Sequence, residues 1–209
     1  MGSPPSQAVE PSGPRGQSVV FLDRDGTINR NYEDGPVYQL ARFELLPGAA
    51  RGIRLLNDLG VKVLVVTNQG GINHTERDFG WEEYRRIESK MHADLKAECG
   101  AFVDDLLLCH HADYEKCACR KPRTGLFERA ARRHSFDPAR SFMVGDDEAD
   151  LEAGHAVGVR TVLVESGWKK GVAETAAGRG IAPEKVVPDL LEAARYIVAE
   201  LREPRERAS

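Results

Sequence analysis

The chain has 209 residues, enough for one domain with a sizeable core, and a formal net charge of −4 at pH 7. This charge and the lack of a basic block argue against nucleic acid as a partner. The longest apolar runs are far too short to span a bilayer, and the N-terminus lacks the pattern of a signal peptide. We therefore expect a cytoplasmic, monomeric protein that binds neither nucleic acid nor membrane.

Both ends of the chain are expected to lie outside the folded domain. Residues 1–17 are rich in Pro, Ser and Gly and hold almost nothing to bury, a composition that predicts a disordered tail. Residues 201–209 are strongly charged and are expected to form a flexible C-terminal tail. The domain itself is therefore expected to span residues 18–200.

Between these tails, short apolar runs alternate with helical patterns. The predicted strands are 18–23, 61–68, 103–109, 141–146 and 160–166. The predicted helices are 47–60, 81–99, 124–134 and 149–156. This alternation predicts an α/β fold, a Rossmann-like parallel sheet with helices on both faces. Only residues 30–44 and 70–84 are long enough to shield a pocket, so at most a minimal cap is expected.

Three of the predicted strands end in a polar residue whose side chain is suited to catalysis or ligand binding. These residues are Asp23, Thr67 and Asp146. Ligands of open α/β sheets bind beyond the carboxyl ends of the strands, where such residues meet. We therefore expect the three side chains to converge on one pocket.

Asp23 and Asp25 form the first acidic strand end, and the two-residue period of a strand tends to project both the same way. Two carboxylates so close would raise the pKa of one of them. A hard dication such as Mg²⁺ removes the conflict, and Asp146 adds a further oxygen ligand. A lone D-x-D pattern also suits a turn or a helix cap. The Gly-Thr that follows and the second acidic strand end, VGDDEAD, favour the metal site.

A second metal pattern lies in the segment CHHADYEKCACRKP. Cys109 and His111 form C-x-H, and Cys117 and Cys119 form C-x-C after a five-residue spacer. Two close pairs of soft ligands joined by a short loop suit tetrahedral Zn²⁺. His110 is the rival ligand, but the alternating spacing favours His111. Because all four ligands come from protein, the predicted zinc-binding loop is structural.

Four motifs, DRDGT, VTNQGG, CRKP and GDDEAD, resemble in this order those of the haloacid dehalogenase superfamily phosphatases. The resemblance spans residues 19–166. It implies that Asp23 is a nucleophile that forms an aspartyl-phosphate, and that Asp25 protonates the leaving oxygen and later activates water. It also implies that Mg²⁺ is held by Asp23, Asp146 and the carbonyl of Asp25.

The same resemblance implies how the substrate is held. Thr67 and the backbone of Asn68 are expected to bind phosphoryl oxygens, with Gln69 among the substrate-binding residues, and Lys121 is expected to neutralise their charge. Arg120 is expected to bind a second anionic or hydroxyl group of the substrate with its planar guanidinium. The implied substrate is a small phosphorylated metabolite. Asp150 is interpreted either as a residue that supports the metal ligands from behind or as a helix-start residue, and in both cases lies outside the metal set.

The pattern C-x-H…C-x-C-R-K-P resembles one branch of the superfamily, which holds heptose bisphosphate phosphatases and histidinol-phosphate phosphatases. GTIN, FELLPG and TNQGG are more similar to the heptose group. The short zinc spacer is more similar to the histidinol group, and Asp147, expected to face the pocket, stands where the heptose group usually has lysine. A sugar bisphosphate is therefore the expected substrate and histidinol phosphate the alternative. An alternative of another class is a zinc-stapled binding protein without turnover.

Overall fold

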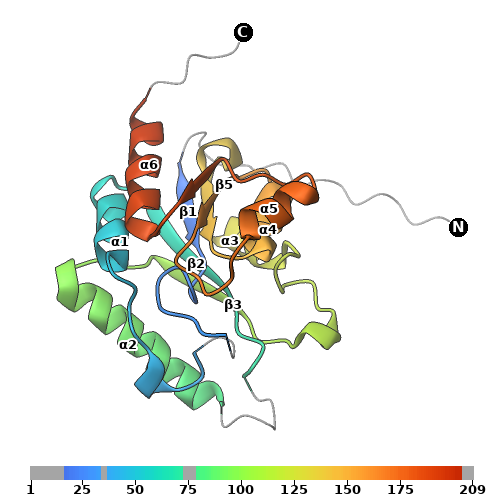
Figure 1. Ribbon diagram of the computed structural model, residues 1–209. Coiled ribbons are helices and arrows are strands. Elements are labelled where there is room, and N and C mark those ends of the chain that lie inside the picture. The colour runs from blue at the N-terminus through green and yellow to red at the C-terminus, as the bar shows by residue number, and fades with distance from the viewer. Residues whose placement is uncertain (1–16, 34–36, 73–78, 204–209) are drawn as a thin grey trace, which may run out of the picture.

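The computed structural model describes residues 17–33, 37–72 and 79–203. These residues form a parallel six-stranded sheet in the order β3-β2-β1-β4-β5-β6, with helices on both faces (Figure 1). The strands are β1 (Val19–Leu22), β2 (Lys62–Asn68), β3 (Asp105–Cys109), β4 (Phe142–Gly145), β5 (Arg160–Val164) and β6 (Lys185–Val187). The helices are α1 (Ala49–Asp58), α2 (Trp81–Cys99), α3 (Gly125–Arg133), α4 (Glu148–Ala156), α5 (Val172–Gly178) and α6 (Leu190–Arg202). The α/β fold expected from the sequence is confirmed.

The central strands are apolar on both faces because helices cover both. In β1, Val20 and Leu22 face the core under α1, α2 and α6, while Val19 and Phe21 face the core under α3 and α4. All four side chains are fully buried. Burial of this kind is worth about 25 cal/mol per Å² of apolar surface. The continuous apolar run of the first strand, which a half-exposed strand would not need, thus reflects its central place in the sheet.

The described chain extends the fold beyond the last element expected from the sequence, at residue 166. Strand β6, helix α5 and helix α6 follow it, and α6 packs against α1. Strand β6 has only three residues, two of them exposed, which leaves little apolar signal. Helix α6 ends at Arg202, two residues past the expected boundary at 200. The expected tails fall largely on residues 1–16 and 204–209, outside the described residues.

Two further expectations concern the surface of the fold. The described parts of 30–44 and 70–84 hold one 3-10 turn, Leu40–Arg42, and the first residues of α2. These short segments agree with the expected minimal cap. Within the described ranges, every helix is too short or too polar to cross a membrane.

Candidate active site and cysteine cluster

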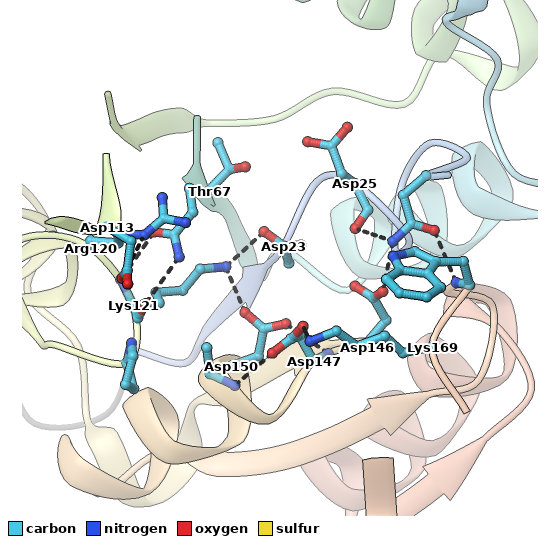
Figure 2. Close-up of a pocket in the computed structure, with 15 residues that line it drawn as sticks. Asp23, Asp25, Thr67, Asp113, Arg120, Lys121, Asp146, Asp147, Asp150 and Lys169 are labelled. Carbon is cyan, nitrogen blue, oxygen red and sulfur yellow. Dashed lines mark hydrogen bonds and ion pairs between the residues drawn. The ribbon is translucent and has the colours of Figure 1, made fainter. Parts of the chain in front are cut away.

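A cavity of about 390 Å³ opens at the carboxyl ends of the central strands (Figure 2). Asp23 follows β1, Thr67 is the last residue but one of β2 and Asp146 follows β4, and all three line this cavity. Because β1 lies between β2 and β4, parallel pairing brings their carboxyl ends to one edge. The predicted convergence of these three residues is confirmed.

Asp23 and Lys121 form a buried ion pair at the floor of the cavity. Lys121 Nζ donates to Asp23 Oδ1 at 2.7 Å, to Asp150 Oδ1 at 2.6 Å and to the Val66 carbonyl at 2.7 Å. Burial lowers the pKa of Lys121, but the charges of Asp150 and Asp23 more than offset it and raise that pKa above its usual value. The ammonium therefore stays charged beside Asp23. Asp150, interpreted from the sequence as a helix-start residue, also holds this lysine.

The side chain of Asn68 fixes the backbone that carries Lys121. Asn68 Nδ2 donates to the Lys121 carbonyl and Asn68 Oδ1 accepts from the Lys121 amide, both at 3.0 Å. Thr67 is fully buried and its Oγ1 accepts from Gln69 Nε2 at 2.9 Å. The side chains of Asn68 and Gln69 are thus engaged with protein. Gln69, which the sequence placed among the substrate-binding residues, is fully buried and donates to both Thr67 and Asp25.

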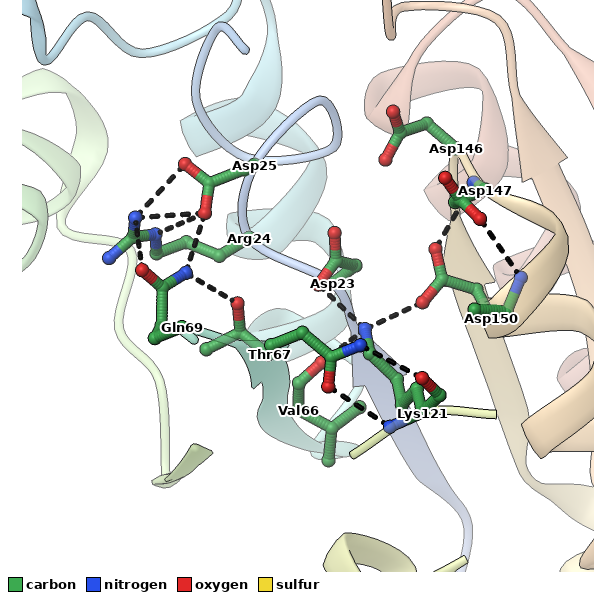
Figure 3. A network of polar contacts seen from close by, with 12 residues as sticks. Asp23, Arg24, Asp25, Val66, Thr67, Gln69, Lys121, Asp146, Asp147 and Asp150 are labelled. Atoms are coloured by element: carbon green, nitrogen blue, oxygen red, sulfur yellow. Dashed lines mark hydrogen bonds and ion pairs between the residues drawn. The ribbon is translucent and has the colours of Figure 1, made fainter. Parts of the chain in front are cut away.

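Asp25 contacts a buried polar network rather than the partners of Asp23 (Figure 3). Arg24 donates to both Asp25 carboxylate oxygens, from Nε at 3.1 Å and from Nη2 at 3.0 Å. Gln69 Nε2 and Asn29 Nδ2 donate to the same carboxylate at 2.7 and 3.0 Å. Burial raises the pKa of Asp25, but Arg24, Asn29 and Gln69 more than offset it and hold that pKa below its usual value. The strand period predicted a shared direction with Asp23; the adjacent arginine, unnoticed in the sequence, gives Asp25 its own partners.

The acidic cluster fits a dication. Carboxylate oxygens of Asp23, Asp146 and Asp150 lie within 4.8 Å of one another. Burial, then the charges of Asp23 and Asp150, raise the pKa of Asp146 well above its usual value. Asn31 Nδ2 donates to Asp146 Oδ2 at 3.0 Å and to the Asp25 carbonyl at 3.4 Å, so the Asn31 amide holds these two oxygens near each other. A hard cation that prefers oxygen ligands would relieve the repulsion among the carboxylates.

Two glycines let the backbone approach Asp146 closely. Gly26 adopts a φ of +93°, a left-handed conformation that glycine adopts at little cost. A Cβ at Gly26 would lie 2.2 Å from Asp146 Oδ2, and one at Gly167 would lie 2.0 Å from the same atom. Both positions therefore need glycine for the acidic cluster to form.

The cysteine and histidine pattern forms one cluster. The Sγ atom of Cys119 lies 3.3 Å from that of Cys109, 3.5 Å from that of Cys117 and 3.3 Å from His111 Nδ1. Tetrahedral zinc with Zn–S bonds of about 2.3 Å would set sulfurs roughly 3.8 Å apart, so the donor set fits Zn²⁺. His110, the rival ligand, instead stacks on the ring of His111. The choice of His111 over His110 agrees with the structure.

The cluster leads directly into the cavity wall. Arg120 follows Cys119 and lines the cavity, where its Nη1 donates to the His111 carbonyl at 3.4 Å. Its Nε lies 3.5 Å from Asp113 Oδ1, whose side chain is 90% exposed. On the opposite side of Asp23, Lys169 pairs with Asp147 (Figure 2). Asp147 thus faces the cavity, whereas Lys169, which follows the last predicted strand, was missed.

A buried carboxylate, a charged lysine and a cluster of carboxylates that fits a dication, all around one cavity, can stabilise the charge of a phosphoryl group in transfer. The fold and site therefore define the class of metal-dependent phosphatases. A profile of the HAD-hydrolase-like family matches residues 118–193.

The chain is 37% identical over 159 residues to a D-glycero-beta-D-manno-heptose-1,7-bisphosphate 7-phosphatase of Haemophilus ducreyi, covering 73% of this chain and 85% of that protein. It is 32% identical over 156 residues to the histidine biosynthesis bifunctional protein HisB of Campylobacter jejuni, covering 74% of this chain but only 44% of that protein. A crystal structure of D,D-heptose 1,7-bisphosphate phosphatase from B. bronchiseptica, complexed with magnesium and phosphate, superposes with a TM-score of 0.77 at 32% identity and covers 88% of this chain and 99% of that one. The chain belongs to the HAD-like hydrolase family, and it is a phosphoric monoester hydrolase.

Proposed function

We propose that the protein is a Mg²⁺-dependent phosphatase that removes the 7-phosphate of D-glycero-D-manno-heptose 1,7-bisphosphate. The observation that carries the chemistry is the contact of Asp23 with Lys121, 2.7 Å apart and beside Asp146 in one cavity. The two proteins named above that are covered over most of their own length, 85% and 99%, are heptose 1,7-bisphosphate phosphatases by name, which supports the substrate.

The reaction proceeds in two displacements on phosphorus. In the first, a carboxylate oxygen of Asp23 attacks phosphorus, the bond to the sugar oxygen breaks, and that oxygen takes a proton from Asp25. In the second, water gives a proton to Asp25 and attacks the aspartyl-phosphate, which releases inorganic phosphate and restores Asp23. Lys121 neutralises the charge on the phosphoryl oxygens, and Thr67 with the Asn68 backbone binds them.

Asp25 has to change partners between these steps. Its contacts with Arg24 and Gln69 hold the carboxylate ionised, which is the form needed to accept a proton from water. As the acid of the first step it has to carry a proton, which is favoured when its carboxyl turns away from Arg24. Asp25 is therefore in its base form while its carboxylate is bound to Arg24 and Gln69.

Two metals complete the proposal. Asp23, Asp146 and the Asp25 carbonyl would hold Mg²⁺, which supplies charge to stabilise the transferring phosphoryl group. Cys109, His111, Cys117 and Cys119 would hold a structural Zn²⁺ with no open position. The zinc loop keeps Arg120 and Lys121 directed at the cavity.

A primary phosphate fits this cavity because it reaches Asp23 while the rest of the sugar stays near the rim. Arg120 on that rim meets the second phosphate or the hydroxyls. Histidinol phosphate, the alternative substrate, carries a cationic amine in place of the second phosphate. Asp147 on the opposite rim is the observation that favours this alternative.

The deciding experiment is kcat/KM on both compounds, since this ratio reports differential binding of the transition state. A preference for the heptose bisphosphate supports the proposal. A preference of more than about tenfold for histidinol phosphate would overturn the substrate. Complete lack of turnover on either compound, and on p-nitrophenyl phosphate with Mg²⁺, would favour the zinc-stapled binding protein. The domain limits of 18–200, the monomeric state and the cytoplasmic location are further parts of the proposal.

A further inference from the structure

The wall opposite Arg120 carries an ion pair with no role in the chemistry described so far. Lys169 Nζ pairs with Asp147 Oδ2 and lies 3.5 Å from Glu148 Oε2. Asp147 and Lys169 line the same cavity as Asp23, and their side chains are 35% and 37% exposed. The pair therefore faces a substrate bound at Asp23 and stays open to water.

The loop that carries Lys169 is anchored to the catalytic floor. The Ser166 hydroxyl donates to the Gly26 carbonyl at 2.7 Å, and the Trp168 amide donates to Asn31 Oδ1 at 3.1 Å. Asn31 in turn donates to Asp146. Lys169 is thus held at a fixed point of the rim, and only its flexible side chain has to move to meet a ligand.

Lys169 and Lys121 both line the cavity, but they differ in how firmly their carboxylate partners hold them. Lys121 is fully committed to Asp23 and Asp150 at the floor. Asp147, in contrast, is fixed as the N-cap of α4, because its Oδ1 accepts from the Ala149 amide at 3.1 Å. Lys169 is free to exchange this carboxylate for another anion, since ion pairs this exposed contribute little to stability. When Lys169 binds another anion, the Asp147 carboxylate remains at the rim without the lysine as its partner.

We propose that Asp147 and Lys169 are a specificity pair, in which Lys169 binds the second phosphate of a bisphosphate substrate together with Arg120, one cation from each wall of the cavity, and Asp147 favours a cationic group. This inference rests on the proposed function and deepens it. A phosphate carries up to two negative charges and outcompetes the Asp147 carboxylate, and the Glu148 carboxylate 3.5 Å away, for the ammonium. A cationic amine, in contrast, gains nothing from Lys169 and is attracted by Asp147. The balance of the two side chains thus sets which substrate class the pocket prefers.

The test uses three variants of the full-length enzyme with Mg²⁺. The measured quantity is kcat/KM on heptose 1,7-bisphosphate divided by kcat/KM on histidinol phosphate. Lys169→Gln should lower this ratio about tenfold, because it removes the cation and exposes Asp147. Asp147→Asn should raise it about threefold or more, and asparagine keeps the N-cap because it caps helices as well as aspartate does.

Lys170→Gln is the matched control. Lys170 adjoins Lys169 but contacts the Gly167 carbonyl and lies outside the main cavity, so its removal should leave the ratio within about twofold of the wild type. The proposal requires opposite shifts in the two test variants. Shifts in the same direction, unchanged ratios, or an equal shift in Lys170→Gln would overturn it.

This design separates the two inferences. A wild-type enzyme that prefers histidinol phosphate overturns the proposed substrate, while the variants still report whether the pair sets the ratio. A wild-type enzyme that prefers the bisphosphate, with a ratio that Lys169→Gln leaves unchanged, overturns the specificity pair alone. Thermal melting of each variant confirms that the enzymes compared are folded.

Discussion

The ammonium of Lys121 lies 2.7 Å from the carboxylate of Asp23, although 98 positions separate the two residues in the chain. Both side chains are buried, and the Asn68 side chain fixes the lysine backbone from the other side. Burial raises the pKa of Asp23, and Lys121 opposes that rise. The lysine thus favours the ionised form that a nucleophile requires, and it stands where phosphoryl charge would build up.

Asp23→Asn should abolish turnover and leave the fold intact. An amide oxygen does not attack phosphorus as a carboxylate does, and the substitution removes one metal ligand as well. Lys121 keeps Asp150 as a buried partner, so no uncompensated cation results. Turnover of p-nitrophenyl phosphate and the far-UV circular dichroism spectrum check the two statements. Asp58→Asn, on an exposed carboxylate paired with Arg54, is the matched control and should keep full activity.

Asp25→Asn should retain some phosphoryl transfer only with good leaving groups. An alcohol leaving group needs a proton from Asp25, whereas p-nitrophenolate leaves without one. The loss in kcat is therefore expected to be about 10²–10⁴-fold with a sugar phosphate and clearly smaller for the burst of p-nitrophenol. Equal losses on the two substrates would show that Asp25 is not the acid.

The sequence predicted the floor of the site better than its walls. Asp23, Thr67 and Asp146 were found because polar residues at the ends of apolar strands have few other reasons to be there. The direction of the Asp25 side chain was not predictable, since it depends on a buried Arg24 that hydrogen-bonds across to another strand end. Long-range contacts of this kind leave no local pattern.

The same limit applies to the rim of the cavity. Lys169 is one of two adjacent lysines in the segment SGWKK, and only the anchored loop shows which of them faces the cavity. The four members of the cysteine and histidine cluster, in contrast, were predicted together, because their spacing within one short loop is itself the signal. The C-terminal helix also carries an amphipathic pattern and is predictable from the sequence.

Cys117→Ser should lose zinc and lower the thermal stability. A structural zinc site contributes its binding free energy to folding, and three remaining ligands hold the metal far more weakly. Metal analysis of the purified wild type should give about one zinc per chain. Cys99→Ser is the matched control, because Cys99 lies at the end of α2 outside the cluster, and it should keep the metal. A fully folded, never chelated wild type without zinc would contradict the assignment.

Arg120→Ala should raise KM for the heptose bisphosphate by about fivefold to tenfold, with a smaller effect for p-nitrophenyl phosphate. The guanidinium is held weakly by the His111 carbonyl and the exposed Asp113, so it is available to a second phosphate. p-Nitrophenyl phosphate has no group for it to bind. Arg86→Ala, an exposed arginine of α2 paired with Glu83, controls for loss of surface charge. Equal effects on both substrates would argue against a contact to the second phosphate.

Mg²⁺ should stabilise the fold more at about pH 8 than at about pH 5.5. Burial raises the pKa of Asp150 from 3.8 to about 7, and the pKa of Asp146 lies well above its usual value for the same reason. An acid whose pKa is higher in the folded state binds more protons folded than unfolded between the two values. Without metal, these groups therefore cost stability as pH rises from about 4 to about 7.

The cation reverses this loss because it binds the ionised carboxylates and competes with protons. The rise in melting temperature on adding Mg²⁺ is thus expected to be small where the acidic cluster is protonated and larger where it is ionised. Differential scanning fluorimetry across this pH range, with and without Mg²⁺, measures it directly. Asp146→Asn should remove most of the metal-dependent rise at the higher pH and should itself melt higher than the wild type there without metal, since it relieves the repulsion. A rise of equal size at both pH values would mean that the metal is held by groups other than this cluster.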